Sequence, residues 1–132
     1  MHSKPVIRLA EVTRVLEAAR QHALAEQWPV TIVVVDDGGH PLALQRLDGC
    51  APAGAYIAME KARTSALGRK ETRDYEDMVN RGRTAFVTAP LLTCLEGGVP
   101  LQVQGQVVGA IGVSGVKPDQ DAQVAKAGAA AL

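Results

Sequence analysis

The sequence predicts an α+β fold, in which helices cover a central antiparallel sheet within a single domain that spans residues 1–132. Two observations carry this prediction. Two stretches of the chain place apolar or small residues at the spacing of a helix, and two pairs of β-rich runs are each joined by a short glycine-containing turn. Strands joined by hairpins run antiparallel, and a chain of this length can bury one hydrophobic core.

The first half of the chain predicts a helix followed by two strands. An apolar stripe at helical spacing runs towards Pro29, where the helix ends. The run VTIVVV at 30–35 is almost entirely β-branched, which predicts a strand buried on both faces. The segment DDGGHP at 36–41 then turns the chain into a strand at 42–47, because its glycines can adopt positive φ and its aspartates can accept backbone N–H groups. The stripe consists of Leu9, Val12, Leu16, Ala19 and Ala23.

The second half predicts a closely packed helix, a second hairpin and a terminal helix. Residues 51–70 are good helix formers that share a narrow face of small side chains. Charges of both signs are interleaved from 61 to 83, which indicates a solvated face. Strands at 99–104 and 106–114 are joined by one glycine, and Pro118 with two following aspartates begins the last helix. The narrow face consists of Met59, Ala62 and Ala66.

Glycines interrupt the last predicted strand, in GQVVGAIGVSG at 105–115. Glycine weakens a strand, so its presence marks a place where another backbone or a ligand comes close. Two interpretations stay open: a helix packs tightly there, or Gly112, Ser114 and Gly115 form the floor of a flat ligand pocket. The G-x-x-G-x-x-G spacing within a strand does not match the dinucleotide-binding fingerprint.

The composition argues against several classes of function. Fourteen basic and fourteen acidic side chains cancel, so no overall field attracts nucleic acid or an anionic membrane surface. Cys50 and Cys94 lie far apart and are expected to remain thiols. The sequence has no apolar run typical of a signal peptide or of a membrane span. We therefore expect a cytoplasmic protein.

Only His22 among the three histidines is a candidate metal ligand. The histidines lack the H-x-x-x-H spacing of zinc sites. His2 belongs to the N-terminal segment and His40 to a hairpin turn, where polar residues are expected. His22 lies beside the apolar stripe of the first helix, at the border between core and solvent. It is either a surface histidine or an axial ligand to an iron.

Four blocks of sequence, in the same order, resemble the GlcG/HbpS-type haem-binding family, which includes the C-terminal domain of PduO-type proteins. The resemblance covers nearly the whole chain. Four blocks in order are a far more specific signal than any one of them. They are PVTIVVVDDGGHPLALQRLDG (29–49), KARTSA (61–66) with Thr72 shortly after it, GGVPLQVQGQVVGAIGVSG (97–115) and QDAQVAKAG (120–128).

The resemblance implies a profilin-like fold, homo-oligomers and, in some members, haem binding or haem degradation, in small-molecule catabolism or redox sensing. A first-helix histidine has been proposed as the iron ligand in similar members, and His22 is the residue that could inherit this role. Haem also needs cations near its propionates, for which Arg46, Lys61 and Arg63 are the candidates. Trp28 stands where glycine is common in the family. Further departures are Leu47, Cys50 and Val116.

A small-molecule enzyme is the alternative interpretation. A pocket around Lys61, Thr72, Gly97, Gly98 and Ser114 would bind a hydroxy or keto acid. Lys61 would hold the carboxylate, and backbone N–H groups near the glycines would hold an oxyanion. The sequence offers no identifiable His or Glu as a base for this chemistry. A purely structural oligomer that supports a partner enzyme is a third interpretation, so catalysis stays an open question.

Overall fold

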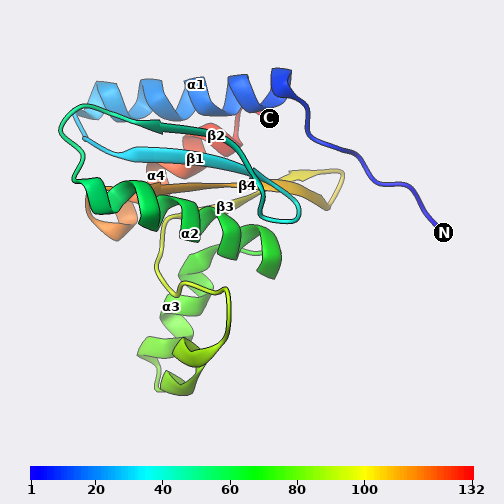
Figure 1. Cartoon of the computed structure of the whole chain (residues 1–132), viewed down its shortest axis with the longest axis vertical. Helices are drawn as coiled ribbons and strands as arrows, with labels where there is room; N and C mark the ends of the chain where they lie inside the picture. The colour runs from blue at the N-terminus through cyan, green and yellow to red at the C-terminus, as the bar shows by residue number, and fades with distance from the viewer.

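The computed structural model describes residues 1–132 and shows a four-stranded antiparallel sheet between two layers of helix (Figure 1). Helices α1 (Leu9–Glu26) and α4 (Pro118–Ala129) cover one face, and α2 (Pro52–Gly68) covers the other. The strand order is β2-β1-β4-β3. The α+β fold and both hairpins are therefore confirmed. The strands are β1 (Thr31–Asp36), β2 (Pro41–Arg46), β3 (Gly98–Val103) and β4 (Gln106–Ser114).

Strand β1 is buried on both faces, as its β-branched run predicts. Ile32 and Val34 join the larger core beneath α1 and α4. Val33 and Val35 point to the other face and pack against the alanines of α2, because successive side chains of a strand alternate. The sheet therefore separates two hydrophobic clusters, and a residue that contacts both helical layers must pass around its edge.

The glycines of β4 are covered by the chain's own backbone. A methyl group on Gly112 would overlap backbone atoms of Ala58 and Ala62 in α2, and one on Gly115 would lie 2.5 Å from the carbonyl oxygen of Pro29. The tightly packed helix is thus confirmed at Gly112. The flat ligand pocket expected over Gly112 and Gly115 is wrong for this chain, since backbone atoms fill the space that a ligand would need.

The buried stripe of α1 differs slightly from the predicted one. Val12, Val15, Ala19 and Ala23 are its buried residues. Leu9, which was expected on this face, is 77% exposed. A helix turns by about 100° per residue. With Val15 among the buried residues, the centre of the buried stripe is rotated around the helix axis away from Leu9, which is left outside it.

The chain between α2 and β3 forms an arm that projects from the layered body (Figure 1). The arm contains α3 (Thr72–Asn80) and a short 3-10 helix, Thr84–Thr88. The ring of Tyr75 stacks on Phe86 with centroids 5.2 Å apart, and the ammonium group of Lys70 lies 4.5 Å from the centroid of the Tyr75 ring. Mixed charge predicted a solvated continuation here, but a five-residue 3-10 helix carries no periodic signal.

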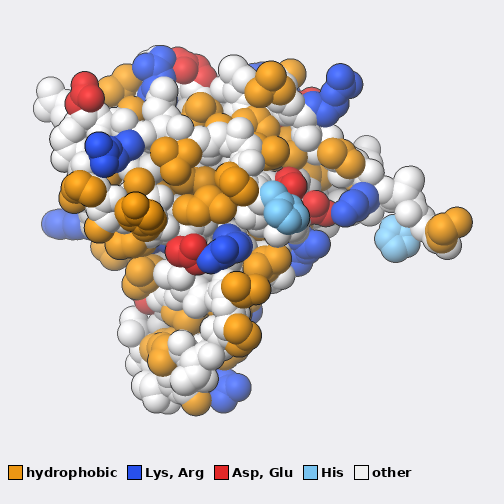
Figure 2. All heavy atoms as spheres, viewed as in Figure 1, with side chains coloured by type: hydrophobic (Ala, Val, Ile, Leu, Met, Phe, Trp, Pro, Cys, Tyr) orange, Lys and Arg blue, Asp and Glu red, His pale blue; other side chains and the backbone are white.

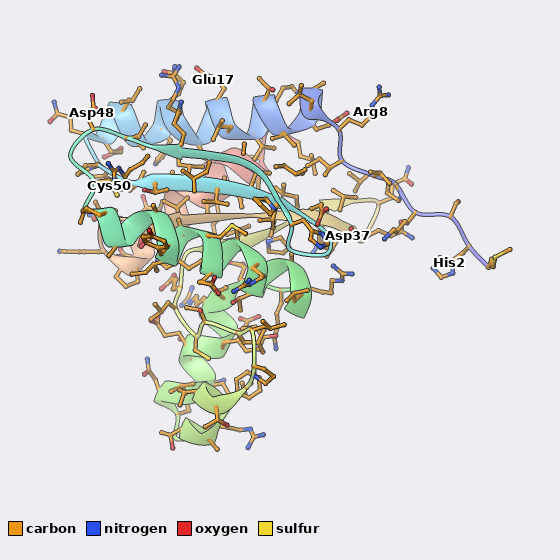
Figure 3. The ribbon with its side chains drawn as sticks, in the orientation of Figure 1. His2, Arg8, Glu17, Asp37, Asp48 and Cys50 are labelled. Atoms are coloured by element: carbon orange, nitrogen blue, oxygen red, sulfur yellow. The ribbon has the colours of Figure 1, made fainter.

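The β1–β2 turn confirms the predicted role of aspartate. One carboxylate oxygen of Asp36 accepts the N–H groups of Gly38 and His40. Asp37 lies at the same turn (Figure 3). Its carboxylate is 2.6 Å from the Nζ of Lys4 in the N-terminal segment. None of the helices combines the length and the apolar composition needed to cross a membrane.

Candidate functional site

The structure does not gather the four predicted haem-contacting residues into one place. His22 lies on α1 and Arg46 at the end of β2, while Lys61 and Arg63 lie on α2, across the sheet from α1. Arg63 pairs with Glu60 of its own helix and packs near the hairpin glycine Gly39. A site that used all four residues would therefore need more than this chain alone.

His22 lies on the side of α1 that faces α4. Each residue of a helix is rotated by about 100° around the helix axis from the one before it. On this basis His22 is rotated by roughly 60° from the centre of the buried stripe, towards the side of the helix that carries Arg14. The Nε of Arg14 donates to the carbonyl of Ala131, beyond the end of α4. Arg20 and Leu24 lie on the opposite side of the stripe, towards β2. The buried stripe of α1 thus separates His22 from the residues that face β2.

The imidazole of His22 has a nitrogen that is buried without a partner. The residue is half-buried, but its Nε2 is shielded from solvent and makes no hydrogen bond. The ring of Trp28 is its aromatic neighbour, with centroids 6.0 Å apart and ring planes inclined by 55°. This distance lies within the usual range of aromatic pairs. The structure thus agrees with the predicted border position and adds an orphaned nitrogen to it.

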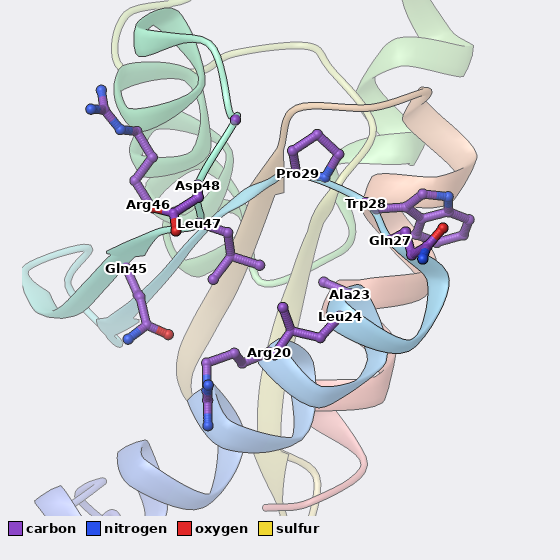
Figure 4. A pocket seen from close by; sticks show the side chains of 11 residues that line it. Arg20, Ala23, Leu24, Gln27, Trp28, Pro29, Gln45, Arg46, Leu47 and Asp48 are labelled. Atoms are coloured by element: carbon purple, nitrogen blue, oxygen red, sulfur yellow. The ribbon is translucent and has the colours of Figure 1, made fainter.

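A hollow of about 650 Å³ opens between the end of α1 and the end of β2. Figure 4 shows Ala23, Leu24 and Leu47 directed towards its centre, and the side chain of Arg46 directed away. Arg20 lies at its rim and is already bound to Glu17 at 2.7 Å. His22 does not line the hollow. The full lining is Arg20, Ala23, Leu24, Gln27, Trp28, Pro29, Gln45, Arg46, Leu47, Asp48 and Gly49.

Lys61 is committed to a buried ion pair, so the solvated face predicted from 61 onward does not include it. Its Nζ lies 2.9 Å from the Asp121 carboxylate and donates to the carbonyl of Val113 at 3.0 Å. Both side chains are almost fully buried, at 4% and 3% exposure. Burial raises the pKa of the Asp121 carboxyl, outweighing the opposite effects of Lys61 and of the Val116 N–H group. The pair joins α2 to α4 past the edge of the sheet.

Two glycines at the start of β3 make room for this lysine. A methyl group on Gly97 would lie 2.8 Å from the Lys61 Nζ, and one on Gly98 would overlap the carbonyl of Lys61. The Gly98 N–H group donates to the buried hydroxyl of Thr72 at 2.8 Å. Lys61, Thr72, Gly97 and Gly98 are therefore brought together as the enzyme interpretation expects. In this chain they bind one another, and the charge of Lys61 is already balanced.

Ser114 is the remaining residue of that predicted pocket. It is buried at 7% exposure and pairs with Thr31 of β1 in the sheet register. Its carbonyl oxygen lies 3.7 Å from the Cys50 sulfur. These contacts place Ser114 at the end of β4, where its backbone takes part in the sheet.

Two features of the site were not singled out from the sequence. Asp121 was assigned to the helix dipole, whereas it is the partner of Lys61. One signal was available. Lys61 stands next to Ala62, which belongs to the face of α2 that packs on the sheet, and a charge that is buried beside such a face needs a partner of opposite charge. Trp28 was noted only as a departure from the family pattern. Trp28 comes just after the end of the first helix, and a residue in that position commonly packs against the last turns of the helix, which here include His22.

Comparisons with known proteins agree with this architecture. The family described as haem-degrading protein, HbpS-like, matches residues 7–130. Protein GlcG from Escherichia coli K12 is 59% identical over 114 residues, which are 86% of this chain and 85% of GlcG. A crystal structure of a double mutant of Streptomyces reticuli HbpS has a TM-score of 0.90 at 31% identity, covering 100% of this chain and 90% of that one.

A crystal structure of a PduOC:heme complex has the same fold, with a TM-score of 0.87 at 23% identity over 97% of this chain and 96% of that one. The family match spans almost all of the sheet and its helices, including the α1 segment that carries His22. The buried residues of the larger core all lie within the matched range. The chain belongs to the family of haem-degrading, HbpS-like proteins.

Proposed function

We propose that this protein binds haem and that His22 Nε2 is its ligand to the iron. The observation that carries the proposal is the buried nitrogen of His22, which has no hydrogen-bond partner. The haem complex of PduOC, a protein of the same fold, supports it. The proposal makes the chain a binding module for haem handling, with no catalytic reaction assigned to its own side chains.

The chemistry of His22 fits an axial ligand. A buried polar atom without a partner costs roughly 1–3 kcal/mol of folding free energy, so an apolar residue at position 22 would stabilise the ligand-free fold. A neutral imidazole nitrogen without a competing hydrogen bond is a ready donor to iron. When bound, haem would supply a redox-active iron whose properties depend on that donor.

The predicted cations do not fit the same place in one chain. Lys61 is neutralised by Asp121, Arg63 is paired with Glu60, and the side chain of Arg46 points away from the hollow beside α1. Of the four residues predicted to contact haem, only His22 therefore fits that role within one chain. We propose that the propionates are held at the surface of the chain, between subunits of a homo-oligomer.

An apolar patch on β2 and α2 supports the homo-oligomer. We call Leu42, Leu44 and Tyr56 the β2 patch; they are 42%, 52% and 77% exposed. Figure 2 shows hydrophobic side chains gathered on this side of the molecule. Strand β2 is also an edge of the sheet, and an open edge with exposed leucines favours pairing with another chain.

The test of haem binding is a haemin titration followed by the Soret absorption band. We expect the wild-type protein to shift this band and His22→Ala to weaken haemin binding at least about tenfold, because a lost ligand bond is worth more than the 1.4 kcal/mol that a factor of ten represents. His40→Ala is the matched control, since His40 is an exposed histidine of the hairpin turn. Equal spectra and affinities for the wild type and His22→Ala would remove His22 from the site.

The test of assembly is the native mass measured by analytical ultracentrifugation. Leu44→Asp places a charge in the β2 patch, opposite Val33 in the sheet register, and should shift the protein towards monomer. Val103→Asp is the control, because Val103 is an exposed apolar residue (37%) at the end of the other edge strand. A wild-type mass equal to the 13.9 kDa of one chain would contradict the proposed homo-oligomer.

A further inference from the structure

Trp28 lies between two different environments. On one side its ring is the aromatic neighbour of His22, 6.0 Å away between centroids. On the other it lines the hollow beside β2, which His22 does not reach. Figure 4 shows Trp28 across the hollow from Gln45 and Arg46. Trp28 is therefore a neighbour of the His22 ring and, at the same time, part of the wall of the hollow.

A large planar ligand cannot reach this nitrogen in the conformation described. His22 as a residue is only half-buried, but its Nε2 is shielded from solvent. An iron within a macrocycle must approach along the lone pair of that atom. The contact with Trp28 must therefore open, or an equivalent movement of His22 must occur, before the bond forms.

The hollow offers a place to which the indole can move. Its volume is about 650 Å³, and cavities of roughly 300–1,000 Å³ accommodate drug-sized molecules, so it has room for an indole ring. Trp28 follows Gln27, which has a left-handed backbone conformation at the end of α1 (φ 60°). Trp28 itself is only partly buried against the core, so a change of rotamer does not require the core to unfold.

We propose that Trp28 is a gate over His22 Nε2, closed in the ligand-free protein, and that it opens into the hollow to admit a metal centre. The gate deepens the proposed function, because it determines how readily His22 can coordinate haem iron. Minor conformations are commonly populated at about 0.1–10%, and apparent affinity falls by the populated fraction. Opening the gate permanently should therefore strengthen coordination by about tenfold or more.

The first test measures access to the nitrogen without haem. Pentaammine(aqua)ruthenium(II) has one exchangeable position and binds accessible histidine. Its bulk disfavours Nδ1, the ring nitrogen nearer the main chain, so the label reports on Nε2. Cleavage after Glu26 separates His22 from His40 for mass measurement. In the wild type, His22 should be labelled at least about tenfold more slowly than the exposed His40. Trp28→Ala should bring the labelling rate of His22 close to that of His40.

Two further variants keep this test decisive. Trp28→Phe retains an aromatic ring in the core, so it serves if Trp28→Ala folds poorly, and it should give an intermediate labelling rate. Leu47→Ala is the matched control, because Leu47 lines the same hollow and packs on the same core but is not an aromatic neighbour of His22. Equal labelling of His22 in the wild type and both Trp28 variants would overturn the gate, as would equal acceleration by Leu47→Ala.

Haemin then separates the gate from the proposed function. If both are correct, Trp28→Ala binds haemin about tenfold more tightly than the wild type, and adding His22→Ala abolishes the gain. If labelling of His22 responds to Trp28 but neither protein shifts the Soret band, the gate stands and haem binding fails. If haemin binds equally to the wild type and Trp28→Ala through His22, the gate is refuted while haem binding stands.

Discussion

Replacing Gly112 by alanine should destabilise the folded protein, because the backbone of α2 occupies the space that the new methyl group needs. That methyl would overlap backbone atoms of Ala58 and Ala62 and lie 2.9 Å from the Ala62 Cα. None of these atoms belongs to a flexible side chain. The helix must therefore retreat from the sheet by between about half an ångström and 1 Å to restore ordinary contacts.

The cost follows from the cluster that α2 forms with the sheet. It contains Val33, Val35, Ala58, Ala62, Ala66 and Ala110. At about 2 kcal/mol for each valine and about 0.8 kcal/mol for each alanine, its burial represents about 7 kcal/mol. A gap of up to about 1 Å forfeits a quarter to a half of the contact energy. The expected loss of unfolding free energy is therefore about 2–4 kcal/mol, within or slightly above the usual range for overpacked cores.

Urea denaturation followed by the fluorescence of Trp28, the single tryptophan, measures this loss directly. For a domain of this size the same change should lower Tm by roughly 10 °C. Gly38→Ala is the matched control, because its methyl would meet chiefly the ring of the exposed His40 side chain and no backbone atom. Stability of Gly112→Ala within about 0.5 kcal/mol of the wild type would refute the close packing of α2 on β4.

The remaining predictions concern buried polar groups. Lys61→Met should cost about 3–5 kcal/mol in urea denaturation by leaving Asp121 unpaired, and the double variant Lys61→Met/Asp121→Leu should recover most of it; a double variant as unstable as the single one would contradict this. The folded-state pKa of Asp121 is raised by burial, so its contribution to stability is full below the ordinary aspartate pKa of about 3.9 and is lost as pH rises through the folded pKa. Asp121→Asn should remove that decline from the curve of unfolding free energy against pH, and an unchanged slope would count against it. His22→Leu should raise the stability of the ligand-free protein by about 1 kcal/mol, and a loss of stability by the same measurement would indicate that His22 Nε2 has a partner.

Much of the fold could be predicted because the responsible signals are local. The β-branched run of β1, the Asp-Gly chemistry of its turn and the proline that starts α4 act within a few residues of themselves. Helix α1 was predicted with nearly correct ends, and three of its buried residues were predicted, but Val15 is buried where Leu9 was expected. Such errors arise because the spacing of apolar residues shows that a helix has a buried face, but it does not fix which residues lie at the margins of that face.

The candidate site was less predictable, because its contacts join distant parts of the chain. Lys61 and Asp121 are 60 residues apart, and the sequence presented Lys61 as a candidate ligand-binding cation and Asp121 as a helix-dipole carboxylate, with nothing to pair them. The contact between His22 and Trp28 depends on how the chain turns at the end of α1. Periodicity placed His22 at the border of the core but carried no information on which of its nitrogens has a partner.

The sequence by itself determined the antiparallel sheet, its two hairpins, the helices and the family, because propensity, turn chemistry and ordered blocks are properties of neighbouring residues. It also determined that something must lie close to the glycines of β4. Only the tertiary structure decided that this neighbour at Gly112 is the backbone of α2, that Lys61 is neutralised, and that the ring of Trp28 lies beside His22. The physical reason is that burial and pairing depend on which distant segments the fold brings together. The sequence around a charged residue or a glycine does not show which distant residue it will contact.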